Sequence, residues 1–219
     1  MQMISEIKLL LQKELILEWR SKFAISGVVL YVFSTIFVSS LIIMQVQTVT
    51  WNALFWVIML FSAINAVSKS FLQESRGRQM YISGLASPAS ILVAKIIYNC
   101  LLMILLTLIA FTFYSFAFKM QAQDLVMYLV TIVLGSVTFS TLFTLVSAIA
   151  SKAGNGGVLM AILSFPVIIP ALIIISRLAK NAMDGLDRSF NLDEIFTLLI
   201  INVLAIVFSI ILFPYLYKD

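Results

Sequence analysis

The feature that most constrains the fold is a series of six long apolar segments separated by short polar stretches. A helix that crosses the hydrocarbon core of a bilayer needs about 20 mostly apolar residues, and each segment approaches or exceeds that length. The sequence therefore predicts an all-α integral membrane protein in which residues 1–219 form a single transmembrane domain. The predicted spans are residues 24–44, 51–68, 91–118, 125–150, 158–175 and 195–217.

The charge content excludes the usual soluble alternatives. The 219 residues include 14 Lys or Arg and 10 Asp or Glu, so that 11% are charged. An average soluble domain has about 25% charged residues. So few charges cannot cover the surface of a soluble fold, which excludes an ordinary cytosolic enzyme, a disordered chain and a nucleic-acid-binding protein. The net charge of +4 favours basic loops that face an anionic membrane leaflet or an anionic partner.

Histidine is missing from the sequence and cysteine is almost missing, and both are residue types common in catalytic and metal sites. There is no histidine, and Cys100 is the single cysteine. Histidine is the commonest metal ligand and the usual acid–base group near neutral pH, so metal-dependent hydrolysis, Ser-His catalysis and His-ligated haem within this chain are excluded. The GxxxxGK(S/T) pattern of a P-loop is also missing. We therefore predict no catalytic, metal-binding or cofactor-binding residues, and we expect that the chain is not an enzyme.

The first 23 residues predict an amphipathic helix that lies along the membrane interface. Charges recur throughout this segment, whereas a signal peptide has an uninterrupted apolar stretch. Glu14 and Glu18 intrude on the apolar sector of the helix. They either contact protein or turn toward water and pair with Arg20 or Lys22, and the sequence leaves both interpretations open. The apolar sector consists of Met3, Ile4, Ile7, Leu10, Leu11 and Leu15.

The distribution of basic residues predicts which side of the membrane each loop faces. An even number of spans places both termini on the same side. With the N-terminus inside, the inner segments carry ten basic residues and the outer loops carry four, which agrees with the positive-inside rule. Both termini are therefore predicted to be cytoplasmic. The inner set is Lys8, Lys13, Arg20, Lys22, Lys69, Arg76, Arg78, Lys95, Lys152 and Lys218, and the outer set is Lys119, Arg177, Lys180 and Arg188.

The cytoplasmic connection between the second and third predicted spans, residues 69–90, carries the strongest functional signal. It mixes charged side chains with large apolar and aromatic ones, as in a short helix that fits a groove of a partner protein. Ser87 and Pro88 would end this helix and set the direction of the next span. The alternative is a solvated basic loop that only enforces topology. The candidate contact residues are Phe71, Glu74, Arg76, Arg78, Met80, Tyr81, Ile82 and Leu85.

Polar residues and prolines inside the spans are candidates for lining a transport pathway. Asn65, Asn99 and Asn202 would either form hydrogen bonds between helices or contact a substrate. Pro166 and Pro170 interrupt the fifth span, because each lacks the backbone N–H that a helix needs. The interruption would either line a wetted pathway or be a packing kink, and the sequence leaves both open.

Three further expectations concern the ends of the spans. Trp51 and Trp56, near the start of the second span, are expected in an interfacial aromatic belt. Lys95, near the start of the third span, is expected to extend its ammonium group to the membrane surface. The outer loop, residues 176–194, is expected to form one or two short helices, because its apolar residues recur at three- and four-residue spacing.

Several short motifs, taken in their order along the chain, resemble a known family. Lys13-Glu14-Leu15 and Glu18-Trp19-Arg20 lie in the interfacial helix, and Phe71-x-x-Glu74, Leu85-x-Ser87-Pro88 and Lys95 follow the second span. Phe165-Pro166-x-x-x-Pro170 lies in the fifth span. Together these residues resemble the CcmB family, the membrane subunit of the cytochrome c maturation ABC transporter, also called haem exporter protein B. The resemblance covers essentially the whole chain.

The resemblance implies an ABC-2-like permease with six transmembrane helices, an N-terminal amphipathic elbow helix and a cytoplasmic coupling helix. The elbow helix would make contacts through Glu14, Glu18 and Arg20. The coupling helix would act on the ATPase through Phe71, Glu74, Arg76, Arg78, Tyr81, Leu85, Ser87 and Pro88. Asn65, Asn99, Pro166 and Pro170 would be candidates for lining the pathway.

The resemblance also implies partners and a location, the bacterial inner membrane. The partners would be a CcmA-like ATP-binding subunit, a CcmC-like haem-handling subunit, a CcmD-like small subunit and a CcmE-like haem chaperone. ATP hydrolysis by the partner ATPase would drive haem export or release of the haem-loaded chaperone. The chain alone would bind no cofactor, and haem would be cargo handled through its partners. Two alternatives share the predicted architecture, namely an ABC-2 permease for a lipid, glycan or drug, and a membrane scaffold that transports nothing.

Overall fold

The computed structural model describes residues 2–20, 23–43, 46–72, 82, 84–119, 122–152 and 156–216. These residues form α-helices joined by short connections, and no strand occurs among them. The helices are α1 (Gln2–Arg20), α2 (Phe23–Ile42), α3 (Thr48–Leu72), α5 (Pro88–Phe118), α6 (Leu125–Ala150), α7 (Gly156–Met183) and α8 (Leu192–Leu216), and the short 3₁₀ helix η1 (Arg188–Asn191) precedes α8.

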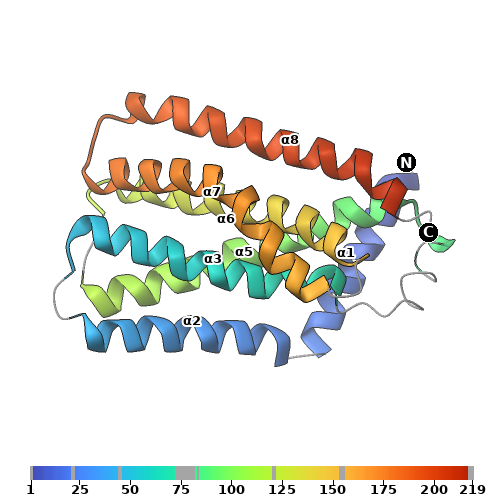
Figure 1. The fold of residues 1–219 in the computed structure, drawn as a ribbon, viewed down its shortest axis with the longest axis horizontal. Coiled ribbons are helices and arrows are strands. Elements are labelled where there is room, and N and C mark those ends of the chain that lie inside the picture. Colours follow the sequence, from blue (N-terminus) through green and yellow to red (C-terminus); the bar gives the residue numbers. More distant parts are fainter. Residues whose placement is uncertain are drawn as a thin grey trace.

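Helices α2, α3, α5, α6, α7 and α8 lie lengthwise side by side, and α1 lies across one end of this bundle (Figure 1). We call this end the α1 end; α3 finishes there, α5 begins there, and α8 also finishes there. Helix α6 occupies the centre, because it contacts α3, α5, α7 and α8. The buried share of the apolar stretch is 67% in α6 and 22% in α8. Helix α6 is therefore the most buried of the long apolar helices, and it packs against four others.

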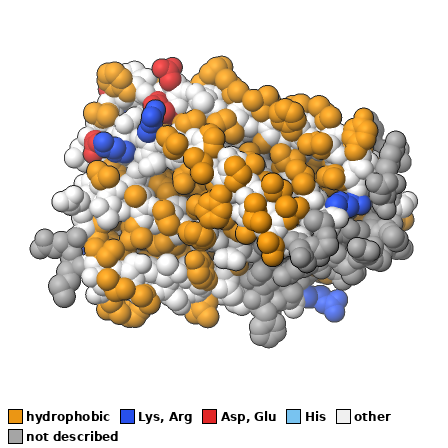
Figure 2. Space-filling view, viewed as in Figure 1, with side chains coloured by type: hydrophobic (Ala, Val, Ile, Leu, Met, Phe, Trp, Pro, Cys, Tyr) orange, Lys and Arg blue, Asp and Glu red, His pale blue; other side chains and the backbone are white. Residues whose placement is uncertain are grey.

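Among the described residues, five helical segments are long and apolar enough to cross a membrane. They are Thr48–Val67 of α3, the whole of α5, α6 and α7, and Arg188–Leu216, which joins η1 to α8. Figure 2 shows a broad band of hydrophobic side chains on one face of the bundle, with charged side chains gathered toward the two ends. The prediction of an all-helical membrane protein is confirmed for these elements. The described apolar part of α2, Ser26–Ile42, is shorter, so a sixth span stays a prediction.

The aromatic residues at the start of α3 form part of the core. The rings of Trp51 and Trp56 are fully buried, so the expectation that they lie in an interfacial belt is wrong. The Trp51 ring packs against Tyr114 of α5 and Tyr128 of α6, with centroids 4.7 and 5.8 Å apart. The Tyr114 hydroxyl donates to the Trp51 carbonyl oxygen at 2.9 Å. These rings fill the space between three helices, which removes more apolar surface from the solvent than an interfacial position would.

Helix α7 differs from the sequence-based expectation in two ways. It continues through Pro166 and Pro170 without a break, and both prolines are exposed on its surface. A proline removes one backbone donor, and transmembrane helices accommodate such a loss by local adjustment. The helix also extends to Met183, so the first part of the predicted outer loop continues α7, and one short helix, η1, lies in the rest of that loop, as expected. Gly185 then turns the chain with a positive φ of 66°, and η1 leads into α8.

Candidate functional site

Half of the predicted coupling residues lie at the α1 end, within the described part of the chain. Phe71 is buried in the last turn of α3, whereas Leu85 is exposed. Ser87 is the N-cap of α5 and Pro88 is the first residue of that helix, as expected for a residue pair that starts a helix. The other four residues, Glu74, Arg76, Arg78 and Tyr81, lie outside the described residues.

Lys95 is the centre of a polar contact between three helices. Its side chain is 3% exposed, and its Nζ donates to the carbonyl oxygen of Ser70 at 2.5 Å. The same Nζ lies 3.4 Å from Oε1 of Glu14 and 4.7 Å from the centre of the Phe71 ring. Glu14 belongs to α1, Ser70 and Phe71 belong to α3, and Lys95 belongs to α5. We call these four residues the α1 junction.

The position of Ser70 explains why its carbonyl accepts a hydrogen bond from a lysine. Ser70 lies in the last turn of α3, where the final four carbonyl groups lack partners within the helix. These carbonyls also form the negative end of the helix dipole, which favours a nearby cation. The expectation that Lys95 extends to the membrane surface is wrong, because α1 covers it and supplies an acidic partner.

The Glu14 carboxylate is shared between two lysines. Its Oε1 lies 3.0 Å from Nζ of Lys13 on the same helix, in addition to the contact with Lys95. Partial burial raises the pKa of Glu14, but the positive charges of Lys95 and Lys13 outweigh this effect, and the pKa lies below its ordinary value. Glu14 is therefore ionised at neutral pH and contacts protein. Glu18 is half-buried and Arg20 is exposed on the same helix.

A second carboxylate, Glu6, attaches α1 to the beginning of α5. Its Oε2 accepts hydrogen bonds from the backbone N–H of Ser87 at 3.2 Å and from the Ser87 hydroxyl at 3.3 Å. Hydrogen bonding to Ser90 and to Ser87 holds the pKa of Glu6 below its ordinary value. The Ser87 hydroxyl in turn accepts from the backbone N–H of Ser90. Helix α1 is thus joined to the N-cap of α5 as well as to Lys95.

Two of the three asparagines proposed for a pathway, Asn99 and Asn202, make contacts between helices. Nδ2 of Asn99, which is buried, donates to Oγ1 of Thr144 on α6 at 2.8 Å and to Oγ of Ser70 at 3.2 Å. Asn202 of α8 bonds to Thr138 and Thr141 of α6. Asn65 is exposed on α3, and its Nδ2 donates to the carbonyl of Phe61. A role of Asn65, Asn99, Pro166 or Pro170 in a pathway stays a prediction.

The partners on α6 were missed by the sequence reasoning. Helix α6 carries hydroxyl groups along its length, and all of them are buried. In a predicted apolar span this enrichment is a signal for hydrogen bonds between helices. The buried hydroxyl residues are Thr131, Ser136, Thr138, Ser140, Thr141, Thr144 and Ser147.

An ion pair joins the elements at the opposite end of the bundle. Nε and Nη2 of Arg188 donate to the two carboxylate oxygens of Asp124 at 2.7 and 3.1 Å. The Asp124 backbone N–H donates to the carbonyl of Ala182, so that the start of α6 is tied to the end of α7 and to η1. Hydrogen bonding from Arg188 holds the pKa of Asp124 below its ordinary value.

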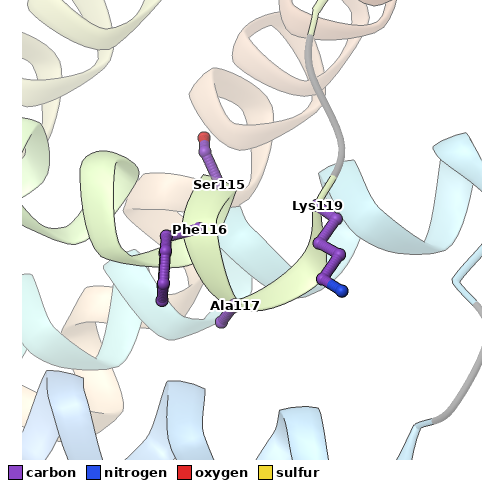
Figure 3. A pocket seen from close by; sticks show the side chains of 4 residues that line it. All are labelled: Ser115, Phe116, Ala117 and Lys119. Carbon is purple, nitrogen blue, oxygen red and sulfur yellow. The ribbon is translucent and has the colours of Figure 1, made fainter.

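The remaining features offer no second site. A shallow hollow at the end of α5 is lined by Ser115, Phe116, Ala117 and Lys119, whose side chains point in different directions (Figure 3). Within the described ranges, no three acidic or cysteine side chains come together in a way that could hold a metal ion. The α1 junction is therefore the best-defined polar site that the structure describes.

Comparison with protein families places this geometry in context. The family model described as CcmB protein matches residues 5–213. The chain belongs to the CcmB family. The match includes every residue of the α1 junction and confirms the resemblance that the short motifs indicated. No curated protein matches the chain.

CcmB membership and the five long apolar helices agree on the broad nature of the protein. The chain is a multi-pass membrane protein, a permease subunit of the haem-exporter kind associated with cytochrome c biogenesis. Membership also connects the chain with ABC transporters in general.

Proposed function

We propose that this chain is the permease subunit of an ABC transporter for cytochrome c maturation. It couples ATP hydrolysis by a CcmA-like ATPase to haem export or to release of a haem-loaded, CcmE-like chaperone. CcmC-like and CcmD-like membrane subunits complete the complex in the bacterial inner membrane. The observation that carries the proposal is the CcmB match over residues 5–213.

The α1 end is the side from which the ATPase acts, and both termini are cytoplasmic in this proposal. Helix α2 is the sixth span, so that residues 1–219 form one transmembrane domain. Helix α1 is the elbow helix at the interface, and several of its large apolar side chains support this placement because they are exposed to the surroundings. These side chains are Met3, Ile4, Leu9, Leu15 and Ile16.

The connection between α3 and α5 is the surface on which the ATPase docks. Its two ends support this assignment. At the α1 end, the Phe71 ring contacts Lys95 of α5, and the backbone N–H of Ser87 donates to Glu6 of α1. A partner that displaces this connection would therefore act directly on two spans. The chain itself supplies no P-loop, so the energy comes from the partner.

A strain without this chain tests the proposal. We expect loss of all c-type cytochromes with unchanged lipids, and restoration by the wild-type gene. Glu74→Lys or Tyr81→Ala would insert into the membrane but fail to restore cytochromes. Loss of an energetically important side chain from a protein interface costs about 2 kcal/mol, which weakens Kd roughly 30-fold. Asp193→Lys, a charge reversal at an exposed position at the other end of the bundle, is the matched control and would restore them.

Two results would contradict the proposal. Normal c-type cytochromes in the deletion strain would exclude a role in their maturation, and altered lipids or glycans would indicate another cargo. Normal cytochromes together with normal ATPase co-purification in both Glu74→Lys and Tyr81→Ala would exclude the docking surface.

A further inference from the structure

We propose that Lys95 is a positioning residue that passes a displacement of the α3–α5 connection to α1. This inference rests on the proposed function, because it describes how the force of the ATPase spreads once the connection moves. It assigns the transmission to one side chain and its contacts in the α1 junction.

The contacts of Lys95 tie together two spans and the helix that lies across their ends. Its ammonium group bonds the last turn of α3 through the Ser70 carbonyl and contacts α1 through the Glu14 carboxylate. The lysine itself lies two turns into α5. Helix α3 ends at Leu72, one residue after Phe71, and the α3–α5 connection begins there. The Phe71 ring faces the same ammonium group. A shift of the connection therefore moves groups that Lys95 holds.

Because Lys95 is buried, the loss of these contacts would cost a large amount of free energy. Lys95 is the only buried charged residue among those that the structure describes. A buried ammonium group that loses its partners keeps the full cost of desolvation. Separation of α1 from α3 would remove at least one partner from Lys95, so the lowest-energy response to a displacement is that the three helices move together.

The contact of Glu6 with Ser87 attaches α1 to α5 in addition to the contact of Glu14 with Lys95. Glu6 meets Ser87 and Glu14 meets Lys95, and both pairs are 81 residues apart in the chain. Leu10, between the two acidic residues, packs against the apolar cluster that contains Phe71. Equal offsets mean that α1 and the first turns of α5 advance in the same sense along their contact. A force on either helix is thus applied along the whole contact.

Spin-label distances test the positioning role directly. Labels are attached at two exposed positions, Leu9→Cys on α1 and Val57→Cys on α3, in a Cys100→Ser background. The complex with its ATPase is reconstituted in lipid nanodiscs, and the distance distribution is measured with and without a non-hydrolysable ATP analogue. We expect one narrow distribution in each state, and a shift between the two states.

Lys95→Met is the decisive variant, because it removes the charge and leaves Glu14 paired with Lys13. We expect a broad distribution that the nucleotide no longer shifts, together with retained ATPase binding and a loss of c-type cytochromes. Glu14→Gln would have a similar effect, and the double variant would add little, since both changes break the same contact. Lys8→Met, the same substitution at an exposed position of α1, is the matched control and would behave as the wild type.

The outcomes separate this inference from the proposed function. A narrow distribution in Lys95→Met that still shifts with nucleotide would overturn the positioning role, and so would strictly additive effects of the two substitutions. A wild-type chain that binds no ATPase would overturn the proposed function. In that case a broadened distribution in Lys95→Met would still support Lys95 as the residue that fixes α1 on α3.

Discussion

Lys95 is buried beside groups from two other helices that satisfy its charge. A lysine near the start of an apolar span usually reaches the membrane surface. Here the lysine is buried and pairs with Glu14, because α1 lies across the end of the bundle. The ionised state of Glu14 and of Glu6 therefore controls how firmly α1 is held.

Acid is expected to release α1 from α5. The pKa values of Glu6 and Glu14 in the folded protein lie below the ordinary value of 4.5. Both groups thus stabilise the attachment fully above pH 4.5, and this contribution is lost as the pH falls from there through the folded-state pKa values. A spin label on Leu9 would report the release as increased mobility. In Glu6→Gln/Glu14→Gln the label would be mobile at every pH, and release of the wild-type helix near neutral pH would contradict the account.

Gly135 is required by the close approach of Trp56. A Cβ atom at position 135 would lie 2.6 Å from Cη2 of the Trp56 ring, which is itself buried. Gly135→Ala is therefore expected to lower the free energy of unfolding by about 1–3 kcal/mol through overpacking. Thermal unfolding in detergent would measure the change. Gly27→Ala is the control, because nothing lies within 4 Å of its new Cβ. Equal stability of the two variants would contradict the requirement for glycine at position 135.

At the scale of the elements, α6 is a hydrogen-bonded centre. Its hydroxyl groups bond to Asn99 of α5 and to Asn202 of α8, and Gly135 lets α3 pack closely against it. The asparagine bonds matter most for α8, since little of that helix is buried. In a bilayer, contacts of this kind hold helices together because lipid competes well for apolar surfaces.

Asn202→Leu is expected to loosen α8. The change removes the bonds from Asn202 Nδ2 to Thr138 and from Thr141 to Asn202 Oδ1, 2.9 and 2.7 Å long. The expected loss is about 1–2 kcal/mol of unfolding free energy. Unfolding in a mixture of mild detergent and dodecyl sulfate would measure it. Thr197→Val, exposed on the same helix and bonded to the Asp193 carbonyl, would leave stability almost unchanged; an equal loss in both variants would contradict a specific role of Asn202.

The helices themselves follow from sequence patterns, and their contacts do not. The predicted fourth span coincides with α6, because apolar length and the capping residue Asp124 define its bounds locally. Helix α7 is longer than the predicted fifth span, because Leu178, Ala179 and Ala182 extend its buried face beyond the most apolar residues. The ends of a helix depend on nearby residues, whereas its neighbours depend on the whole chain.

At the scale of the whole molecule, the sequence indicated which residues belong to the site but not which of them contact one another. The motifs marked Glu14, Phe71 and Lys95 individually, yet the pairing of Glu14 with Lys95 joins residues 81 positions apart and requires the placement of α1. The burial of Trp51 likewise depends on Tyr114 and Tyr128 from other helices. Family membership agrees with the motifs, and the structure adds the contacts among them.

Purification of the complex from membranes tests the central claim most directly. The claim is that this CcmB-family chain has no source of energy of its own and receives motion from a partner ATPase. We expect a P-loop protein to co-purify at fixed stoichiometry, ATP hydrolysis by the complex, and none by the chain alone. Hydrolysis by the isolated chain, or a complex without an ATPase, would contradict the account.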